Sequence, residues 1–194
     1  MNHIGRKLYH VIGGTGLLSI YYLFDRERAL LLYAILFAAA LAFDAMRLAV
    51  PGVNRFVFRH FGDFIRKKEQ DRLTGTAYYI IGVGMSFAVF SRPAATAAIC
   101  FLIFGDAAAA TIGERYGKSK IGGKSLEGTA AFIVAALAAG GFLSSIGLGT
   151  AAWVMLAGAL VAAGTELLSL PVNDNLVIPV ISGAVMQFLI NFAR

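Results

Sequence analysis

Long apolar runs recur from one end of the chain to the other, and they leave few folds open to it. Of its 194 residues, 58% are hydrophobic and 14% are charged, and a soluble domain of this size could not bury so much apolar surface. We therefore predict an all-α, polytopic integral membrane protein that forms a single transmembrane domain over residues 1–194, with about seven transmembrane helices. The predicted spans are residues 8–24, 28–49, 75–91, 93–112, 127–147, 150–166 and 176–193.

Lys and Arg are unevenly distributed between the predicted loops, and this bias indicates the orientation of the chain. They concentrate near the N-terminus and in the loops of residues 50–74 and 113–126. Because cytoplasmic loops are enriched in these residues, we predict a cytoplasmic N-terminus and polar loops that face the cytosol. The net charge of +6 then reflects inner loops of a membrane protein rather than binding to nucleic acid.

The segment of residues 105–128 holds the largest number of candidate functional residues. Asp106 lies inside the fourth apolar run, and a carboxylate at that depth is costly, so it is a functional candidate. The loop after it combines cations with glycines, which let backbone N–H groups approach an anion. We expect Ser125 to cap the next helix and Glu127 to lie in its first turn, beside a phosphate site. The predicted phosphate-binding residues are Gly117, Lys118, Lys120, Gly123, Lys124 and Ser125.

A simpler alternative for this loop is a basic segment that only follows the inner-loop bias, with Glu127 serving the helix dipole. The segment is not a Walker P-loop. Its spacing is too short between Gly113 and Gly117, and too long between Gly117 and Gly123. Any phosphate held here would therefore be held with a different geometry.

Oxygen side chains gather again in residues 166–179, where one apolar run ends and the last begins. Glu166 ends the first run, and Asn173, Asp174 and Asn175 precede the last. Such groups suit Mg²⁺, which binds a few carboxylates together with substrate phosphates. An ordinary turn is the alternative, with Pro179 in a first helical turn. The loop carries no Lys or Arg, however, so we expect its acidic residues to face the basic loop.

A third polar group comes at the start of the first span. Arg6, Lys7 and His10 fall on one helical face at spacings of three and four residues. They could bind phosphate or pair with carboxylates. A basic anchor that snorkels to the membrane surface explains them equally well.

A fourth group closes the second span. Asp44 and Arg47 are three residues apart and could neutralise each other, with Asn54 after the following turn. Residues 55–73 then alternate aromatic with basic side chains. This pattern predicts an interfacial amphipathic segment on the inner leaflet, which could guide a lipid or simply anchor the chain.

Together these residues give the chain a resemblance to the CTP-dependent lipid-alcohol kinases, a family with dolichol kinase, phytol and farnesol kinases and the fungal-type diacylglycerol kinase. The resemblance runs from residue 6 to residue 183 and is most specific between Asp106 and Gly128. It implies a membrane enzyme that transfers the γ-phosphoryl group of CTP to a lipid hydroxyl with Mg²⁺ as cofactor. Its partners would be the nucleotide, the lipid alcohol and membrane lipids, and a homo-oligomer is possible.

For such a reaction, which depends mainly on positioning and charge neutralisation, we propose roles for the polar residues. The loop lysines would hold nucleotide phosphates, and the acidic residues would supply Mg²⁺ ligands, one of them orienting the lipid hydroxyl as a base. The predicted catalytic residues are Asp106, Lys124, Glu127 and Asp174. The predicted metal ligands are Asp106, Glu127 and Asp174. The secondary candidates are Arg6, Lys7, His10, Asp44, Arg47, Asn54, Glu166, Asn173 and Asn175.

Two alternatives stay open at this point. A cytidylyltransferase that forms a CDP-lipid would use the same nucleotide but release pyrophosphate. A small transporter would instead line a polar path with the buried charges Asp44, Arg47 and Asp106, although the predicted outer loops hold few polar residues to continue it.

Overall fold

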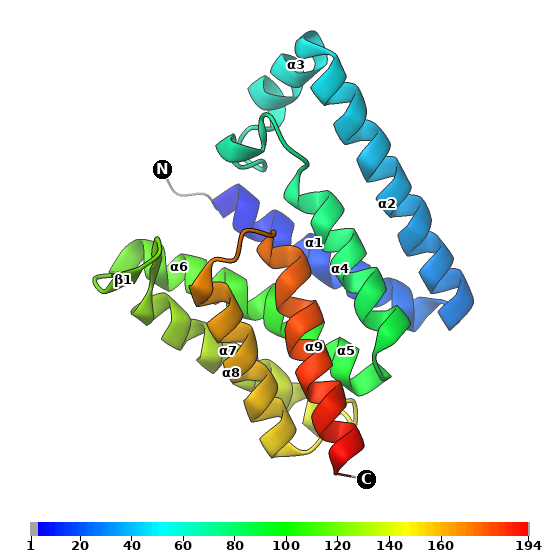
Figure 1. Ribbon diagram of the computed structural model, residues 1–194, viewed down its shortest axis with the longest axis vertical. Helices are drawn as coiled ribbons and strands as arrows, with labels where there is room; N and C mark the ends of the chain where they lie inside the picture. The colour runs from blue at the N-terminus through cyan, green and yellow to red at the C-terminus, as the bar shows by residue number, and fades with distance from the viewer. Residues whose placement is uncertain (1–3, 194) are drawn as a thin grey trace. The chain divides into compact units, whose positions relative to one another are not determined.

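The computed structural model describes residues 4–193, apart from the side chain of Lys68, and these residues are almost entirely helical (Figure 1). Each of the seven predicted apolar runs forms a helix. The helices that match these runs are α1 (Ile4–Leu23), α2 (Arg26–Ala49), α4 (Gly75–Val89), the continuous helix of α5 (Arg92–Cys100), η2 (Phe101–Asp106) and α6 (Ala107–Tyr116), then α7 (Leu126–Ser145), α8 (Ala152–Leu168) and α9 (Asp174–Phe192).

Within the described residues, four helical segments are long and apolar enough to cross a membrane: Arg26–Ala49, Arg92–Tyr116, Leu126–Ser145 and Asp174–Phe192. Gly75–Val89 and Ala152–Leu168 are apolar but shorter. The all-α membrane class is therefore supported, while the seven spans and the cytoplasmic N-terminus stay predictions.

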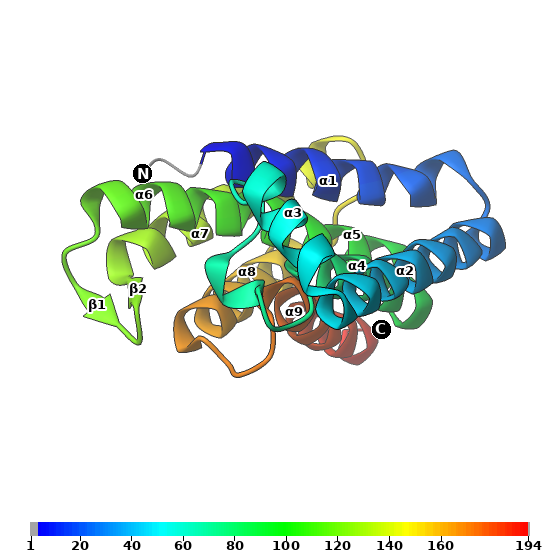
Figure 2. The ribbon, with the colours of Figure 1, turned by 90° about the horizontal axis from the view of Figure 1, so that it is seen from above.

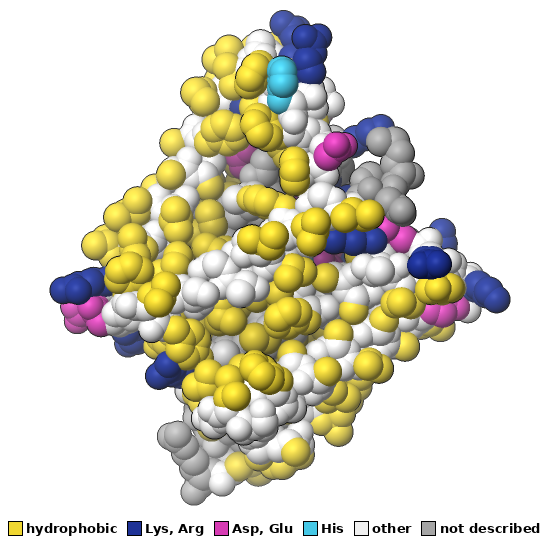
Figure 3. Space-filling model, turned by 180° about the vertical axis from the view of Figure 1, so that it is seen from behind, with side chains coloured by type: hydrophobic (Ala, Val, Ile, Leu, Met, Phe, Trp, Pro, Cys, Tyr) yellow, Lys and Arg dark blue, Asp and Glu magenta, His cyan; other side chains and the backbone are white. Residues whose placement is uncertain are grey.

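The surface of the helices fits this class. Large hydrophobic side chains are widely exposed, among them Ile12 at 68%, Phe142 at 64% and Phe188 at 66%. Figure 3 shows one face on which hydrophobic side chains predominate, while charged ones gather in a few separate groups. So much exposed apolar surface is unfavourable in water and favourable against lipid.

The chain divides into two compact units, Met1–Gly84 and Met85–Arg194. In the first unit, the Tyr33 hydroxyl on α2 donates a hydrogen bond to the Leu17 carbonyl on α1 at 2.8 Å. Gly84 on α4 lies against the same tyrosine, since a Cβ there would be 3.1 Å from the Tyr33 Cβ. One buried aromatic residue thus joins three helices.

The predicted amphipathic segment of residues 55–73 is only partly helical. Helix α3 (Pro51–Phe61) begins earlier than that segment, because a proline is favourable in a first helical turn. It ends before Gly62, and only the short 3₁₀ turn η1 (Lys67–Glu69) follows. Phe56 and Phe61 are exposed on α3, as an interfacial helix requires, but its contact with a membrane stays a prediction.

In the second unit, the helix formed by α5, η2 and α6 supplies the core. Every side chain from Ala94 to Ile103 is buried. Its alanines let neighbouring helices approach closely. Helices α8 and α9 run side by side, joined by the short loop of residues 169–173 (Figure 1).

The middle of this core helix is a π-helical segment, η2, that ends at Asp106. Such wide turns are rare and occur often at functional sites. Gly105 makes close packing against α7 possible, because a Cβ there would lie 2.6 Å from a ring carbon of Phe132. Phe132 is itself fully buried.

The glycine-rich loop between α6 and α7 is a small antiparallel hairpin, which the sequence did not lead us to expect (Figure 2). Strands β1 (Lys120–Ile121) and β2 (Lys124–Ser125) are joined by Gly122 and Gly123, with φ of 56° and 92°. A tight two-residue hairpin turn needs positive φ at both positions, which glycine adopts without strain. Gly123, predicted to bind phosphate, therefore has a conformational role.

We predict that Gly105→Ala destabilises the protein by about 1–3 kcal/mol, because the added methyl group overpacks the contact with Phe132. Thermal unfolding of the purified protein in detergent measures the change. Gly141→Ala is the matched control, since nothing lies within 4 Å of a Cβ at that helical position. Equal behaviour of the two variants would contradict the close packing of η2 on α7.

Candidate functional site

The basic hairpin and the acidic loop of the second unit meet at Lys124. Its Nζ lies 2.5 Å from Glu166 Oε1 and 3.2 Å from Asp174 Oδ2. The Glu166 and Asp174 side chains are only 5% and 11% exposed, whereas that of Lys124 is 28% exposed. The prediction that the acidic loop faces the basic loop is therefore confirmed, and the lysine side chain at their junction is partly exposed.

Asp106 belongs to the same electrostatic neighbourhood, and its charge acts on both Lys124 and Glu166. It is half-buried at the end of the π-helical segment. We call Lys124, Glu166, Asp174 and Asp106 the Lys124 cluster. Burial disfavours the Lys124 ammonium, but the negative charges of Asp174, Glu166 and Asp106 outweigh that cost and raise the pKa of Lys124. The ammonium is therefore charged at neutral pH.

Ser125, next to Lys124, fixes the start of α7. Its hydroxyl accepts a hydrogen bond from the Gly128 backbone N–H at 3.0 Å, which confirms it as the N-cap. It is buried where α6 and α7 come together. A Cβ at Gly113, Gly117 or Gly128 would stand 2.9, 2.7 or 3.0 Å from its oxygen. Gly117 and Ser125 therefore shape the site through packing, whatever they contribute to phosphate binding.

Glu127 takes a position different from that of the other predicted metal ligands. Its carboxylate accepts hydrogen bonds from the Ser119 backbone N–H at 3.2 and 3.3 Å. It thereby ties the start of the hairpin to the first turn of α7. Among the described residues, no group of three or more His, Cys, Asp and Glu side chains is placed to hold a metal ion by itself.

The remaining candidates of the second unit occupy the loops around the cluster. Asn173 caps α9 through a 3.1 Å bond from the Asn175 N–H, and Asn175 is buried in the first turn. Pro179 lies inside α9 rather than in its first turn, because the helix begins at Asp174, earlier than the ordinary-turn alternative assumed. Lys118 and Lys120 are exposed on the hairpin side.

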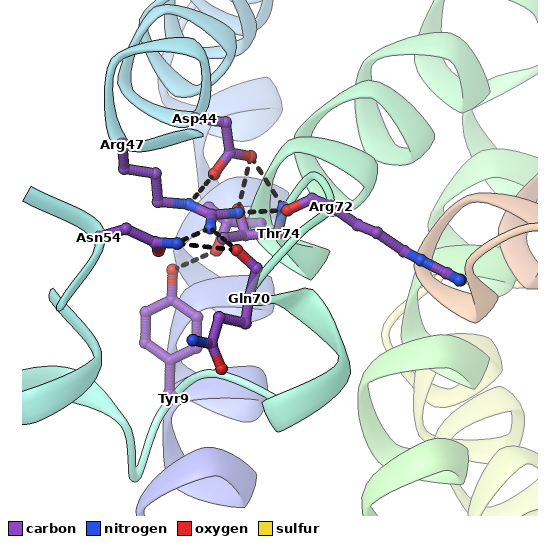
Figure 4. Close-up of polar contacts among 8 residues, drawn as sticks. Tyr9, Asp44, Arg47, Asn54, Gln70, Arg72 and Thr74 are labelled. Carbon is purple, nitrogen blue, oxygen red and sulfur yellow. Dashed lines mark hydrogen bonds and ion pairs between the residues drawn. The ribbon is translucent and has the colours of Figure 1, made fainter. Parts of the chain in front are cut away.

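The first unit holds a second polar cluster, centred on Arg47 (Figure 4). Arg47 Nε lies 2.7 Å from Asp44 Oδ1, and both side chains are fully buried, so the two charges neutralise each other as the spacing suggested. Asp44 Oδ2 also accepts hydrogen bonds from the Thr74 N–H at 2.8 Å and from its hydroxyl at 3.0 Å. Arg47 further donates to the carbonyls of Gln70 and Arg72.

Asn54 extends this cluster to α3. Its Oδ1 accepts from Arg47 Nη1 at 3.2 Å, and its Nδ2 donates to the Gln70 carbonyl at 2.9 Å. The Arg72 side chain points away from the cluster (Figure 4). Asp44, Arg47 and Asn54 thus secure the segment before α4 to the end of α2.

The N-terminal candidates are half-buried on α1. The His10 ring stacks on Tyr79 with centroids 4.8 Å apart, and the Tyr79 hydroxyl donates to the His10 carbonyl at 3.3 Å. Arg6 and Lys7 precede it by one turn. Tyr9, beside them on α1, shares a 3.0 Å hydrogen bond with the Thr76 hydroxyl.

Thr74 is the residue of the Arg47 cluster that sequence reasoning missed. It stands directly before an apolar run, where a hydroxyl side chain favours a helix start. Its partner Asp44 is 30 residues away, and no sequence spacing relates them.

Comparisons with known proteins find relatives of two kinds, an uncharacterised protein and proteins named as lipid kinases. An uncharacterised protein of Rickettsia prowazekii is 30% identical over 185 residues, covering 90% of this chain and 88% of that protein. The CTP-dependent diacylglycerol kinase 1 of Saccharomyces cerevisiae is 33% identical over 60% of this chain and 40% of that protein. Its counterpart in Eremothecium gossypii is 29% identical over 100% of this chain and 69% of that protein. No family model and no solved structure matches the chain.

We predict that Asp44→Asn lowers the free energy of unfolding by about 3–5 kcal/mol, because it leaves the buried Arg47 charge uncompensated. Thermal or denaturant unfolding in detergent measures the loss. Asp25→Asn, at the N-cap of the same helix, is the matched control. Asp25 forms an exposed pair with Arg28, also three residues on, and Asn caps a helix as well as Asp. The control should cost less than about 1 kcal/mol. Similar losses in both variants would contradict a special cost for the buried pair.

Proposed function

The chain belongs to the CTP-dependent lipid kinase family, and we propose that it transfers the γ-phosphoryl group of CTP to the hydroxyl of a membrane lipid. The acceptor would be diacylglycerol or an isoprenoid alcohol such as phytol or a polyprenol. The observation that carries the proposal is the Lys124 cluster, in which the ammonium of a partly exposed lysine side chain meets the carboxylates of Glu166 and Asp174. Phosphoryl transfer depends mainly on positioning and charge neutralisation, and this cluster offers both.

The nucleotide phosphates would bind at the hairpin. Lys124 presents a positive charge on a partly exposed side chain, and Lys118 and Lys120 are exposed lysines of the same loop. The N-terminus of α7 begins at the same place, and the free N–H groups of a first helical turn favour an anion. Glu127 would keep the start of the hairpin in place, through its hydrogen bond from the Ser119 N–H, rather than contact the nucleotide.

The side chains present also fit Mg²⁺. Mg²⁺ in nucleotide enzymes is usually bound by a few carboxylates together with substrate phosphates, rather than by a cage of protein ligands. With Asp106 as the candidate base, Asp174 is the carboxylate that would take part, and the substrate phosphates would complete the set. The metal would neutralise charge that develops on the phosphates.

The proposed reaction is a direct transfer of the γ-phosphoryl group from CTP to the lipid hydroxyl. A bond forms between the lipid oxygen and the γ-phosphorus, and the bond from that phosphorus to the β–γ bridging oxygen breaks, releasing CDP. The proton of the hydroxyl passes to a carboxylate of the Lys124 cluster and then to water. Asp106 is the strongest candidate for this carboxylate, because it closes the π-helical segment inside the core helix, and such segments often occur at functional sites.

The transporter alternative loses its main support. It requires buried charges that line a polar path, and Asp44 and Arg47 are instead fully buried and bonded to each other. Their further partners are Thr74, Asn54 and backbone carbonyls of the same unit. This arrangement supports a structural role for the pair.

We predict that purified protein with CTP, Mg²⁺ and a panel of lipid alcohols forms lipid phosphate and CDP, and that Asp106→Asn lowers the rate by about a hundredfold or more. Asn keeps the size of the side chain but loses the charge needed to accept a proton or bind a metal. Thin-layer separation of labelled lipid and nucleotide products measures both. Asp25→Asn, exposed in the first unit, is the control and should keep full activity.

The identity of the products separates the alternatives. Release of pyrophosphate with a CDP-lipid would identify a cytidylyltransferase instead of a kinase. ATP replacing CTP at equal rate would contradict the nucleotide preference. Near-normal activity of a folded Asp106→Asn variant would contradict the role of that carboxylate.

A further inference from the structure

Glu166 makes the shortest contact of the Lys124 cluster, in a position unfavourable for a negative charge. Its Oε1 lies 2.5 Å from Lys124 Nζ, compared with 3.2 Å for Asp174 Oδ2. It is only 4% exposed, and it stands in the last turn of α8, where the helix dipole disfavours an anion. No basic residue lies in that turn to offset it. Lys124, from a distant segment, is the cation that compensates it.

Stability alone does not account for such a residue. Replacing a buried ion pair by apolar side chains of similar volume is often neutral or even stabilising. An uncharged residue at position 166 would also suit the apolar helix α8 better. The charge of Glu166 is therefore explained by what it does to Lys124.

Asp174 differs from Glu166 in a way that matters for the site. It is the first residue of α9, where the helix dipole stabilises a negative charge. Its contact with Lys124 is the longer one, and its side chain is the more exposed of the two. Asp174 is thus tolerated without Lys124, whereas Glu166 depends on it.

We propose that Glu166 is a positioning residue that anchors the Lys124 ammonium for phosphate binding. Asp174 is the partner that Lys124 gives up in exchange for a phosphate oxygen when the metal–nucleotide complex binds. The inference rests on the proposed function. A lysine side chain is flexible, and its ammonium has several donors, so one carboxylate can hold it while another donor reaches a phosphate oxygen. The Lys124 backbone is already fixed by the hairpin and by the Ser125 cap. Glu166 then fixes the other end of the side chain.

The test is a double-mutant cycle on phosphoryl transfer. Glu166→Gln should lower kcat by about ten- to a hundredfold, because a small displacement of a group that contacts the phosphates is costly, while the KM for CTP changes little. In a Lys124→Met background, Glu166→Gln should cause no further loss, since its effect passes through Lys124. The exposed Glu27→Gln in α2 is the matched control and should leave kcat unchanged.

A second variant separates positioning from charge balance. Glu166→Asp keeps the charge but withdraws the carboxylate by one methylene group, so kcat should fall while the protein stays folded. Full activity of Glu166→Asp, or an equal loss from Glu166→Gln in both backgrounds, would overturn the proposal.

The cycle also keeps this inference distinct from the proposed function. A wild-type protein that forms no lipid phosphate from any nucleotide would refute the kinase activity itself. Should the enzyme be active, unfolding midpoints test the pair independently: Lys124→Met should lower the midpoint more with Glu166 present than with Gln at that position. Equal shifts would show that Glu166 does not hold Lys124.

Discussion

A charge among apolar helices is stable only where an opposite charge or a set of hydrogen bonds meets it, and this constraint decides where the polar residues of the protein lie. In the first unit, Arg47 and Asp44 are fully buried and satisfy each other together with Thr74 and backbone carbonyls. In the second, Lys124 joins Glu166 and Asp174. Each cluster holds a polar segment to the end of an apolar helix.

The two clusters differ in what they leave available. The Arg47 pair is closed, with both side chains at 0% exposure, and its partners are all internal. The Lys124 ammonium is bonded to carboxylates, but the Lys124 side chain is 28% exposed, and the basic hairpin and the N-terminus of α7 begin beside it. A phosphate-bearing ligand therefore finds accessible charge only in the second arrangement. This contrast supports a structural role for the Arg47 cluster and the phosphate-binding role proposed for the Lys124 cluster.

Residues without reactive groups bring the Lys124 cluster together. Gly105 lets α7 approach the π-helical segment, and Gly113 and Gly128 let α6 and α7 close around the Ser125 hydroxyl. The hairpin turn at Gly122 and Gly123 then reverses the chain, so that Lys124 follows directly. Small residues are frequent in membrane helices for packing alone. Here the same packing also sets the position of the ammonium.

The sequence by itself determined the helices, the cap at Ser125 and the Asp44–Arg47 pair, because each depends on hydrophobic periodicity or on neighbours within one helical turn. It also marked Asp106 and Asp174, since a carboxylate in or beside an apolar run is conspicuous. It led us to expect that the acidic residues of the 166–179 loop face the basic loop. Only the tertiary structure decided that Lys124 is the cation that Glu166 contacts, across 42 residues of chain. Likewise, Thr74 reaches Asp44 through packing, and the glycine loop is a hairpin. Such contacts depend on how helices approach one another, and that is set by many distant side chains acting together.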